Sequence, residues 1–289
     1  MRKHLFMMLM LMLSVTAASA QKTVTVSGEA TYTTTSKEPL RNATFQAIEK
    51  ARTDAMEQAF GTIIIQITDI NIAGGNVDID SKHTSMVRGV WIKDLEEPVI
   101  DLHQDPMSDI ITVTARVKGH AKVVDYGFGQ VDVIPMRNGT DPKVNDASIF
   151  RENDRFYLYF NSPVDGYVTA YLVDNNDDVV CLLPYRQSSG EAYEVRKDCD
   201  YVFFSKDMAS DRERGIVDEF DITCDENMEG NILYVLFSPK KFAKPRIKGG
   251  RDKELQVLSL SDFNNWRAKL KSTNDVYEKD FILTIKKRF

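Results

Sequence analysis

Residues 40–61 have the sequence LRNATFQAIEKARTDAMEQAFG. Alanine recurs at every fourth position from Ala43 to Ala59, which is the spacing of one face of an α-helix. Small side chains allow such a ridge to lie close against a sheet. Gly61 stands where a glycine ends a helix in a left-handed turn. The stretch therefore predicts a helix over 40–60 that packs on a β-sheet.

Strand patterns surround this helix. Residues 23–33 alternate β-branched and polar side chains, and residues 62–68 form an apolar run of strand length. Further strands are expected at 87–94, 98–102 and 110–117. One helix with four or five strands indicates a compact α+β domain.

The second half of the chain has a different composition. Nine of the eleven Tyr and eleven of the fifteen Phe lie at or after position 150, which indicates an aromatic core there. One late helix is expected over 259–271, and short strands are expected at 156–160, 167–173, 179–183, 201–205, 216–223, 232–237 and 281–285. Short strands separated by turns are typical of a β-sandwich. The predicted fold class is α+β, a one-helix domain followed by a mainly-β, sandwich-like domain.

Residues 1–20, MRKHLFMMLMLMLSVTAASA, combine a basic tip, an apolar run too short to span a bilayer and an A-x-A cleavage site. They predict a signal peptide and an exported protein, periplasmic or extracellular, with no membrane span after cleavage. Glycine and proline within 126–145 predict a linker or domain entry. The expected domains are then 21–125 and 146–289.

The composition restricts the partners. At 43% hydrophobic and 28% charged residues, the chain has the composition of a folded protein. Its net charge of −6 disfavours nucleic acids and anionic membrane surfaces, because both select for clustered Lys and Arg.

The first domain resembles the N-terminal domain of flagellar assembly protein T and related envelope lipoproteins. The resemblance rests on the strand ending near 27–30 (SGEA), the alanine-spaced helix ending in Gly61, and a late β pair. The two strands of this pair are 86–92 (MVRGVWI) and 111–117 (ITVTARV). The resemblance implies a structural or assembly role in the envelope.

The second domain resembles the bacterial domain of unknown function 4384 family. The matching segments are 154–158 (DRFYL), 162–168 (SPVDGYV) and 179–184 (VVCLLP), together with the helix that contains Asp262 and Trp266. The Asn-Asn-Asp-Asp turn departs from the glycine usual in that hairpin. The family has no established catalytic residues and accompanies other modules, which implies binding or assembly.

No catalytic, cofactor-binding or metal-binding residue is predicted. Beyond the signal peptide the histidines are His83, His103 and His120, all in the first domain, so no Ser-His or Cys-His pair can form within the second. The chain has no G-x-S-x-G elbow, no H-E-x-x-H helix and no Walker loop. We therefore expect a protein that is not an enzyme and needs no cofactor.

Two segments admit two interpretations each. Residues 174–178 (DNNDD) open like a calcium loop, but Val179 and Tyr185 stand where the loop needs Gly and Glu, which favours a hairpin turn. Residues 240–253 contain seven basic side chains. They are either a solvated loop, which is favoured, or a dock for an acidic partner.

The three cysteines have different sequence surroundings. Cys181 lies among apolar residues and is expected to be a buried thiol. Cys199 and Cys224 are the candidate disulfide of an exported protein, with three reduced cysteines as the alternative.

The residues expected to bind a partner are Tyr157, Tyr159 and Tyr167. The alternation over 156–160 leaves the first two on the face opposite Phe156, Leu158 and Phe160; packing under a loop or helix is the alternative. The function expected is an exported, non-enzymatic envelope protein, a binding or assembly module for a protein or glycan partner. The alternative is a secreted carbohydrate-binding or carbohydrate-active protein.

Overall fold

A computed structural model describes residues 23–73, 76–87, 89–124, 131–188, 191–245 and 257–288. The N-terminal domain contains β1 (Val24–Thr35), α2 (Leu40–Phe60), β2 (Thr62–Ala73), β3 (Asn76–Val87), β4 (Gly89–Asp94), β5 (Val99–Gln104) and β6 (Ile110–Val123). The C-terminal domain contains β7 (Asp132–Arg137), β8 (Ile149–Arg151), β9 (Arg155–Asn161), β10 (Gly166–Val173), β11 (Asp178–Leu183), β12 (Tyr193–Val195), β13 (Tyr201–Phe203), β14 (Phe220–Asp221), β15 (Met228–Ser238), β16 (Val257–Ser259), α3 (Leu260–Thr273) and β17 (Tyr277–Lys286). The α+β class is confirmed.

The N-terminal sheet has the order β1–β6–β4, and β5 pairs with the first half of β6. Helix α2 covers one face of it, and the alanine ridge faces this sheet: Ala43, Ala47, Ala51 and Ala55 are buried. A Cβ on Gly28 of β1 would lie 2.3 Å from the carbonyl oxygen of Ala51. The alanine ridge of α2 therefore lies close against the sheet, as expected, and this close contact requires glycine at position 28 of β1.

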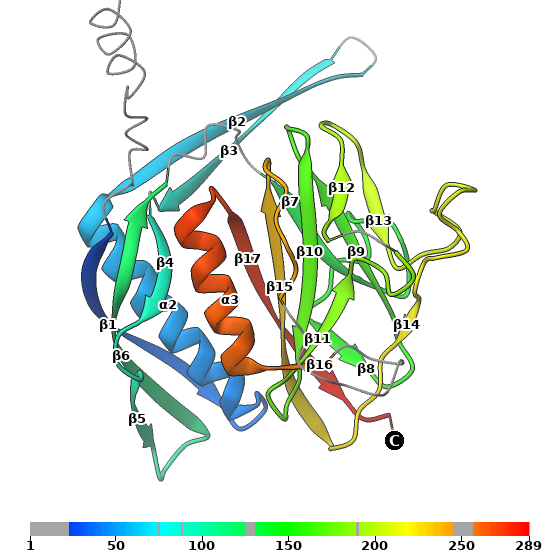
Figure 1. Cartoon of the computed structure of the whole chain (residues 1–289). Coiled ribbons are helices and arrows are strands. Elements are labelled where there is room, and N and C mark those ends of the chain that lie inside the picture. Colours follow the sequence, from blue (N-terminus) through cyan, green and yellow to red (C-terminus); the bar gives the residue numbers. More distant parts are fainter. Residues whose placement is uncertain are drawn as a thin grey trace, which may run out of the picture.

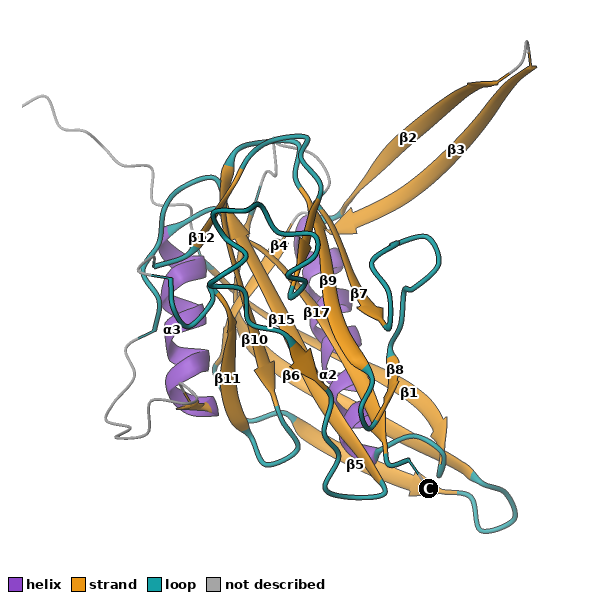
Figure 2. Ribbon diagram, turned by 90° about the vertical axis from the view of Figure 1, so that its right-hand side faces the viewer, coloured by secondary structure: helices purple, strands orange, loops and turns teal. Residues whose placement is uncertain are grey.

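A two-stranded arm extends from this domain (Figures 1 and 2). Strands β2 and β3 pair over their whole length, from Thr62 opposite Val87 to Ala73 opposite Asn76. Each strand has twelve residues, so the ribbon is about 40 Å long. The sequence predicts only the first part of β2, because polar residues interrupt the apolar run beyond Thr68.

The C-terminal domain is a β-sandwich. One sheet has the order β16–β11–β10–β15–β17–β8, with β12 on β10, and the other has β13–β9–β14, with β7 on β9. Phe156, Leu158 and Phe160 of β9 point into the space between the sheets, where Phe237 of β15 also lies. Each such buried side chain stabilises the fold by about 2 kcal/mol. The alternation of side chains along β9 therefore determines which face of this strand is buried in the core.

The expected linker is largely structured. Residues 132–137 form β7, which pairs with β9 from Asp132 opposite Asn161 to Arg137 opposite Phe156. Residues 138–145 form a turn closed by a hydrogen bond from the Arg137 N–H to the Asn145 carbonyl. The C-terminal sandwich therefore begins at β7 and not at residue 146, while residues 126–130 lie outside the described residues.

The two helices form a layer between the N-terminal sheet and the larger sheet of the sandwich (Figure 1). At the start of α2, the Asn42 Nδ2 donates to Thr284 Oγ1 of β17 at 3.0 Å. Gly230 of β15 makes room for this contact, because a Cβ there would lie 2.0 Å from Asn42 Oδ1. The Phe45 ring meets the edge of Tyr234 at 6.4 Å between centroids. The domains therefore share a packed interface. Neither described helix meets the length and apolarity needed to cross a membrane.

Candidate functional site

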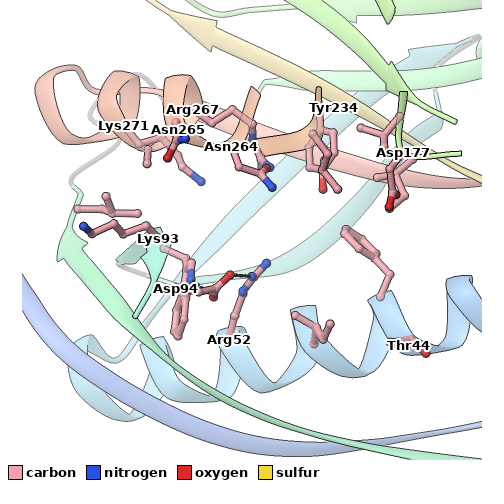
Figure 3. Close-up of a pocket in the computed structure, with 18 of the residues that line it drawn as sticks. Thr44, Arg52, Lys93, Asp94, Asp177, Tyr234, Asn264, Asn265, Arg267 and Lys271 are labelled. Carbon is pink, nitrogen blue, oxygen red and sulfur yellow. Dashed lines mark hydrogen bonds and ion pairs between the residues drawn. The ribbon is translucent and has the colours of Figure 1, made fainter. Parts of the chain in front are cut away.

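A cavity of about 940 Å³ lies between α2 and α3 (Figure 3). One wall of the cavity is a face of α2, whose residues run from Arg41 through Phe45 and Ile48 to Arg52. Their eleven-residue interval corresponds to about 16 Å along the helix. Strand β4, the larger sheet and α3 provide the other walls. The site is thus an elongated cleft built by both domains.

Arg52 projects from α2 into one end of the cleft (Figure 3). Its Nη2 lies 2.5 Å from Asp94 Oδ2, and its Nη1 is paired with Glu49. Trp91 Nε1 donates to the other oxygen of Asp94 at 2.9 Å. Burial lowers the pKa of Arg52, but the charges of Glu49 and Asp94 outweigh it, so the pKa lies above its ordinary value. The buried Nε of Arg52 has no acceptor among the described residues.

A second ion cluster comes from α3 and β17. Glu278 accepts from Arg267 Nε and Lys271 Nζ, each at 3.1 Å, and the Arg267 guanidinium lies 3.9 Å from the centroid of the Tyr234 ring. Burial raises the pKa of Glu278, but the two cations outweigh it and hold the pKa at about 2. Burial lowers the pKa of Lys271. Two buried cations thus share one carboxylate.

Asp280 lies two residues further along β17. Burial, followed by the nearby charges of Glu49 and Glu278, raises its pKa to about 7. Asp280 lines a second, smaller cavity of about 510 Å³, together with residues of α2 such as Gln46. The interface therefore contains one carboxyl group that titrates near neutral pH.

The middle of the main cleft is apolar. Phe45 and Ile48 of α2 face Ile232 of β15 and Leu260 at the start of α3. Beyond them, Arg41 pairs with Asp177 Oδ1 at 2.6 Å and thereby ties α2 to the β10–β11 turn. The cleft is therefore amphipathic along its length.

The three tyrosines expected to bind a partner do not form one surface. Tyr157 and Tyr159 are partly exposed on the outer face of β9, as the alternation predicts, and Tyr159 Oη donates to Asp200 Oδ1 at 2.6 Å. Burial and then Asp200 raise the pKa of Tyr159. Tyr167 lies on β10 of the other sheet and packs against the cluster that includes Phe263 of α3. A common role for all three is not supported by this placement.

The cysteines are free thiols. Cys199 lies just before β13, whose Tyr201 pairs with Phe160 of β9. Cys224 lies just after β14, whose Asp221 pairs with Arg155 at the other end of β9. These two positions on β9 are about 16 Å apart, well beyond the Cα separation that a disulfide bridges. The expected disulfide is therefore not formed. Cys181 is half-buried, and burial raises its pKa to about 11.

The 174–178 segment forms the hairpin turn between β10 and β11. Asp174 Oδ1 accepts from the N–H groups of Asn176 and Asp178 at 2.8 and 2.9 Å, and Asp177 has a φ of 65°. Strands β10 and β11 pair antiparallel on either side of this turn, so the hairpin interpretation is confirmed. Of the basic segment, residues 246–253 lie outside the described residues.

His103 and His120 do not line the cleft. His103 is exposed on β5, and His120 contacts Thr25 across the N-terminal sheet, while the side chain of His83 is outside the described part. In the described ranges, no group of three His, Cys, Asp or Glu side chains is placed to hold a metal ion.

Sequence reasoning missed the cleft itself. The signal was present in α2, where Arg41, Phe45, Ile48 and Arg52 follow a helical spacing on a face other than the alanine ridge. Phe45 and Ile48 give this second face apolar residues, which indicates that the helix has a second packing surface. The position of α3 beside it depends on contacts between distant segments, which no local pattern gives.

Comparison of the chain with protein-family models, with curated proteins and with solved structures finds no match. The two family resemblances drawn from the sequence therefore remain predictions.

Proposed function

We propose that the chain is an exported, non-enzymatic binding protein of the bacterial envelope, and that the cleft between its two domains is its binding site. The observation that carries the proposal is the cleft itself. Its volume of about 940 Å³ falls within the usual range for ligand sites, and its walls combine apolar side chains with a few placed charges. Its cationic, amide and aromatic side chains can contact both the charged and the apolar parts of a ligand.

The packing between the domains supports a preformed site. The Asn42–Thr284 hydrogen bond and the Arg41–Asp177 ion pair fix one end of α2 to the sandwich. Lys122 of β6 donates to the Asn274 carbonyl at the end of α3, at 3.3 Å. A site whose walls are already in place loses little conformational entropy on binding.

Envelope export is the second part of the proposal and rests on residues 1–20, which lie outside the described residues. Fractionation of cells that produce the full chain tests it. Mature protein starting at Gln21 in the periplasm or medium is expected; full-length protein retained in the cytoplasm would contradict export.

The binding site is tested by exposing the mature protein to a small-molecule extract of bacterial envelopes and identifying retained compounds by native mass spectrometry. Thr44→Trp fills the cleft from α2 and should abolish retention. Gln58→Trp, on an exposed position of the same helix, should leave it unchanged. Equal retention by both variants, no retained compound, or chemical conversion of the compound would each contradict the proposal.

A carbohydrate-binding function is the second candidate. It is favoured by the outer face of β9, where Tyr159 lies beside Asp200 and Asn161, because aromatic rings next to polar groups suit sugars. Tyr157→Ala and Tyr159→Ala should then weaken retention of a glycan without affecting a ligand of the cleft.

A further inference from the structure

The polar end of the cleft has an excess of positive charge. Its cations are Arg52, Lys93, Arg267 and Lys271, and its carboxylates are Glu49, Asp94 and Glu278. Four cations against three carboxylates leave one positive charge uncompensated. Because burial raises the pKa of Asp280 to about 7, this neighbouring carboxyl is largely protonated below neutral pH and does not cancel the excess.

Two cationic side chains at this end have a donor for which the described residues provide no acceptor. Lys93 is exposed and has no ion-pair partner among the described residues. The Arg52 Nε–H is buried without an acceptor, which is costly unless a ligand provides one. Figure 3 shows Lys93 and Lys271 on opposite walls of the cleft, with Arg52 reaching up from α2. A carboxylate placed among them would satisfy a buried donor and neutralise the excess charge.

The rest of the cleft suits an apolar chain. Phe45 and Ile48 line the α2 wall and Ile232 lines the facing wall, and Ile48 lies one helical turn from Arg52. The lined face of α2 is about 16 Å long. An extended chain advances about 1.2 Å per backbone bond, so about a dozen carbon atoms span this distance.

We infer that the cleft binds an amphiphile with one carboxylate head and a linear or aromatic apolar body, of the type of a medium-chain fatty acid. The head lies between Arg52, Lys93 and Lys271, and the body lies along Phe45 and Ile48 toward Leu260. This inference rests on the proposed function and adds the chemical class of the ligand.

The test uses Trp91, which lines the cleft beside Arg52. Trp266→Phe leaves Trp91 as the only tryptophan of the chain, so its fluorescence reports on the site. Titration with dodecanoate should change this fluorescence saturably. Methyl dodecanoate, which lacks the charge, should bind about tenfold more weakly, and acetate, which lacks the chain, should give no change.

Charge variants separate recognition of the head from burial of the chain. Lys93→Gln and Lys271→Met should each weaken dodecanoate binding by about fivefold and leave the ester unaffected. Lys269→Gln, on an exposed position of α3 outside the cleft, is the matched control and should change neither. Circular dichroism of each variant confirms that the fold is retained.

The outcomes distinguish this inference from the proposed function. Equal affinity for the acid and its ester, or indifference to both lysine variants, would overturn carboxylate recognition and leave the cleft as the binding site. Failure of every amphiphile, with a Thr44→Trp-sensitive ligand still found in envelope extracts, would overturn the inference alone. Failure of both experiments would overturn both proposals.

Discussion

At the scale of single residues, the interface between the domains depends on charged groups that are shielded from water. Glu278 balances Arg267 and Lys271, and Arg52 is balanced by Glu49 and Asp94. Buried ions of this kind are costly when a partner is removed. Their pKa values therefore give direct predictions for stability.

Asp280→Asn should make stability less dependent on pH. The pKa of Asp280 is about 7 in the folded protein, against 3.8 for a free side chain, so the folded state binds the proton more tightly. Its contribution is fully present below about pH 4 and is lost as the pH rises through 7. The variant should be about 2–4 kcal/mol more stable than the wild type at pH 8 and similar at pH 4. Urea unfolding of both proteins at pH 4 and pH 8 measures this. If the difference in unfolding free energy between variant and wild type were the same at both pH values, the raised pKa of Asp280 would be contradicted.

Glu278→Gln should be strongly destabilising, because it leaves two buried cations without a carboxylate. The expected cost is about 3–5 kcal/mol in urea unfolding at pH 7. Glu96→Gln is the control, since its ion pair with Lys118 is exposed and should contribute less than about 1 kcal/mol. Similar losses in the two variants would show that Glu278 is not the balancing group.

At the scale of elements, the structure follows the sequence where periodicity is strong. Helix α2 runs over 40–60 as the alanine spacing predicts, and β9 alternates as expected. The prediction of a strand over 216–223 is wrong except for Phe220–Asp221, because the rest of this segment is irregular and only these two residues pair with β9. The sequence predicts a linker where β7 forms, because Gly and Pro nearby dominate the local pattern.

Removing β7 should therefore weaken the sandwich. A fragment of residues 131–289 keeps the pairing of β7 with β9 and the buried Val133 and Met136, whereas a fragment of residues 143–289 loses them. The shorter fragment should be less stable by about 3–6 kcal/mol, the value of two buried apolar side chains with their cavities. Urea unfolding of both fragments decides this, and equal stability would restore the linker assignment.

At the scale of the whole molecule, the arrangement of layers creates the cleft. Both helices lie between two sheets from different domains (Figure 1). Side chains of both helices line the cavity. The sequence predicts two domains and two helices but not this juxtaposition. The contacts that produce it join residues such as Asn42 and Thr284, which are 242 positions apart.

The shared interface predicts that the domains unfold together. Trp91 lies in the N-terminal domain and Trp266 in the C-terminal domain, so Trp91→Phe and Trp266→Phe each leave one domain-specific fluorophore. In each variant, the fluorescence of the remaining tryptophan and the circular dichroism of the whole chain should give the same urea midpoint. Midpoints that differ widely would show two independent units with a cleft that does not persist.

The central claim is that the binding site lies between the domains, and a crystal structure of the protein with its retained ligand tests it most directly. The account predicts ligand density between α2 and α3, with the carboxylate within hydrogen-bonding distance of Arg52 Nε and Lys93 Nζ and the apolar body against Phe45 and Ile48. Ligand density on the outer face of β9 beside Tyr157 and Tyr159, with the cleft unchanged, would contradict it.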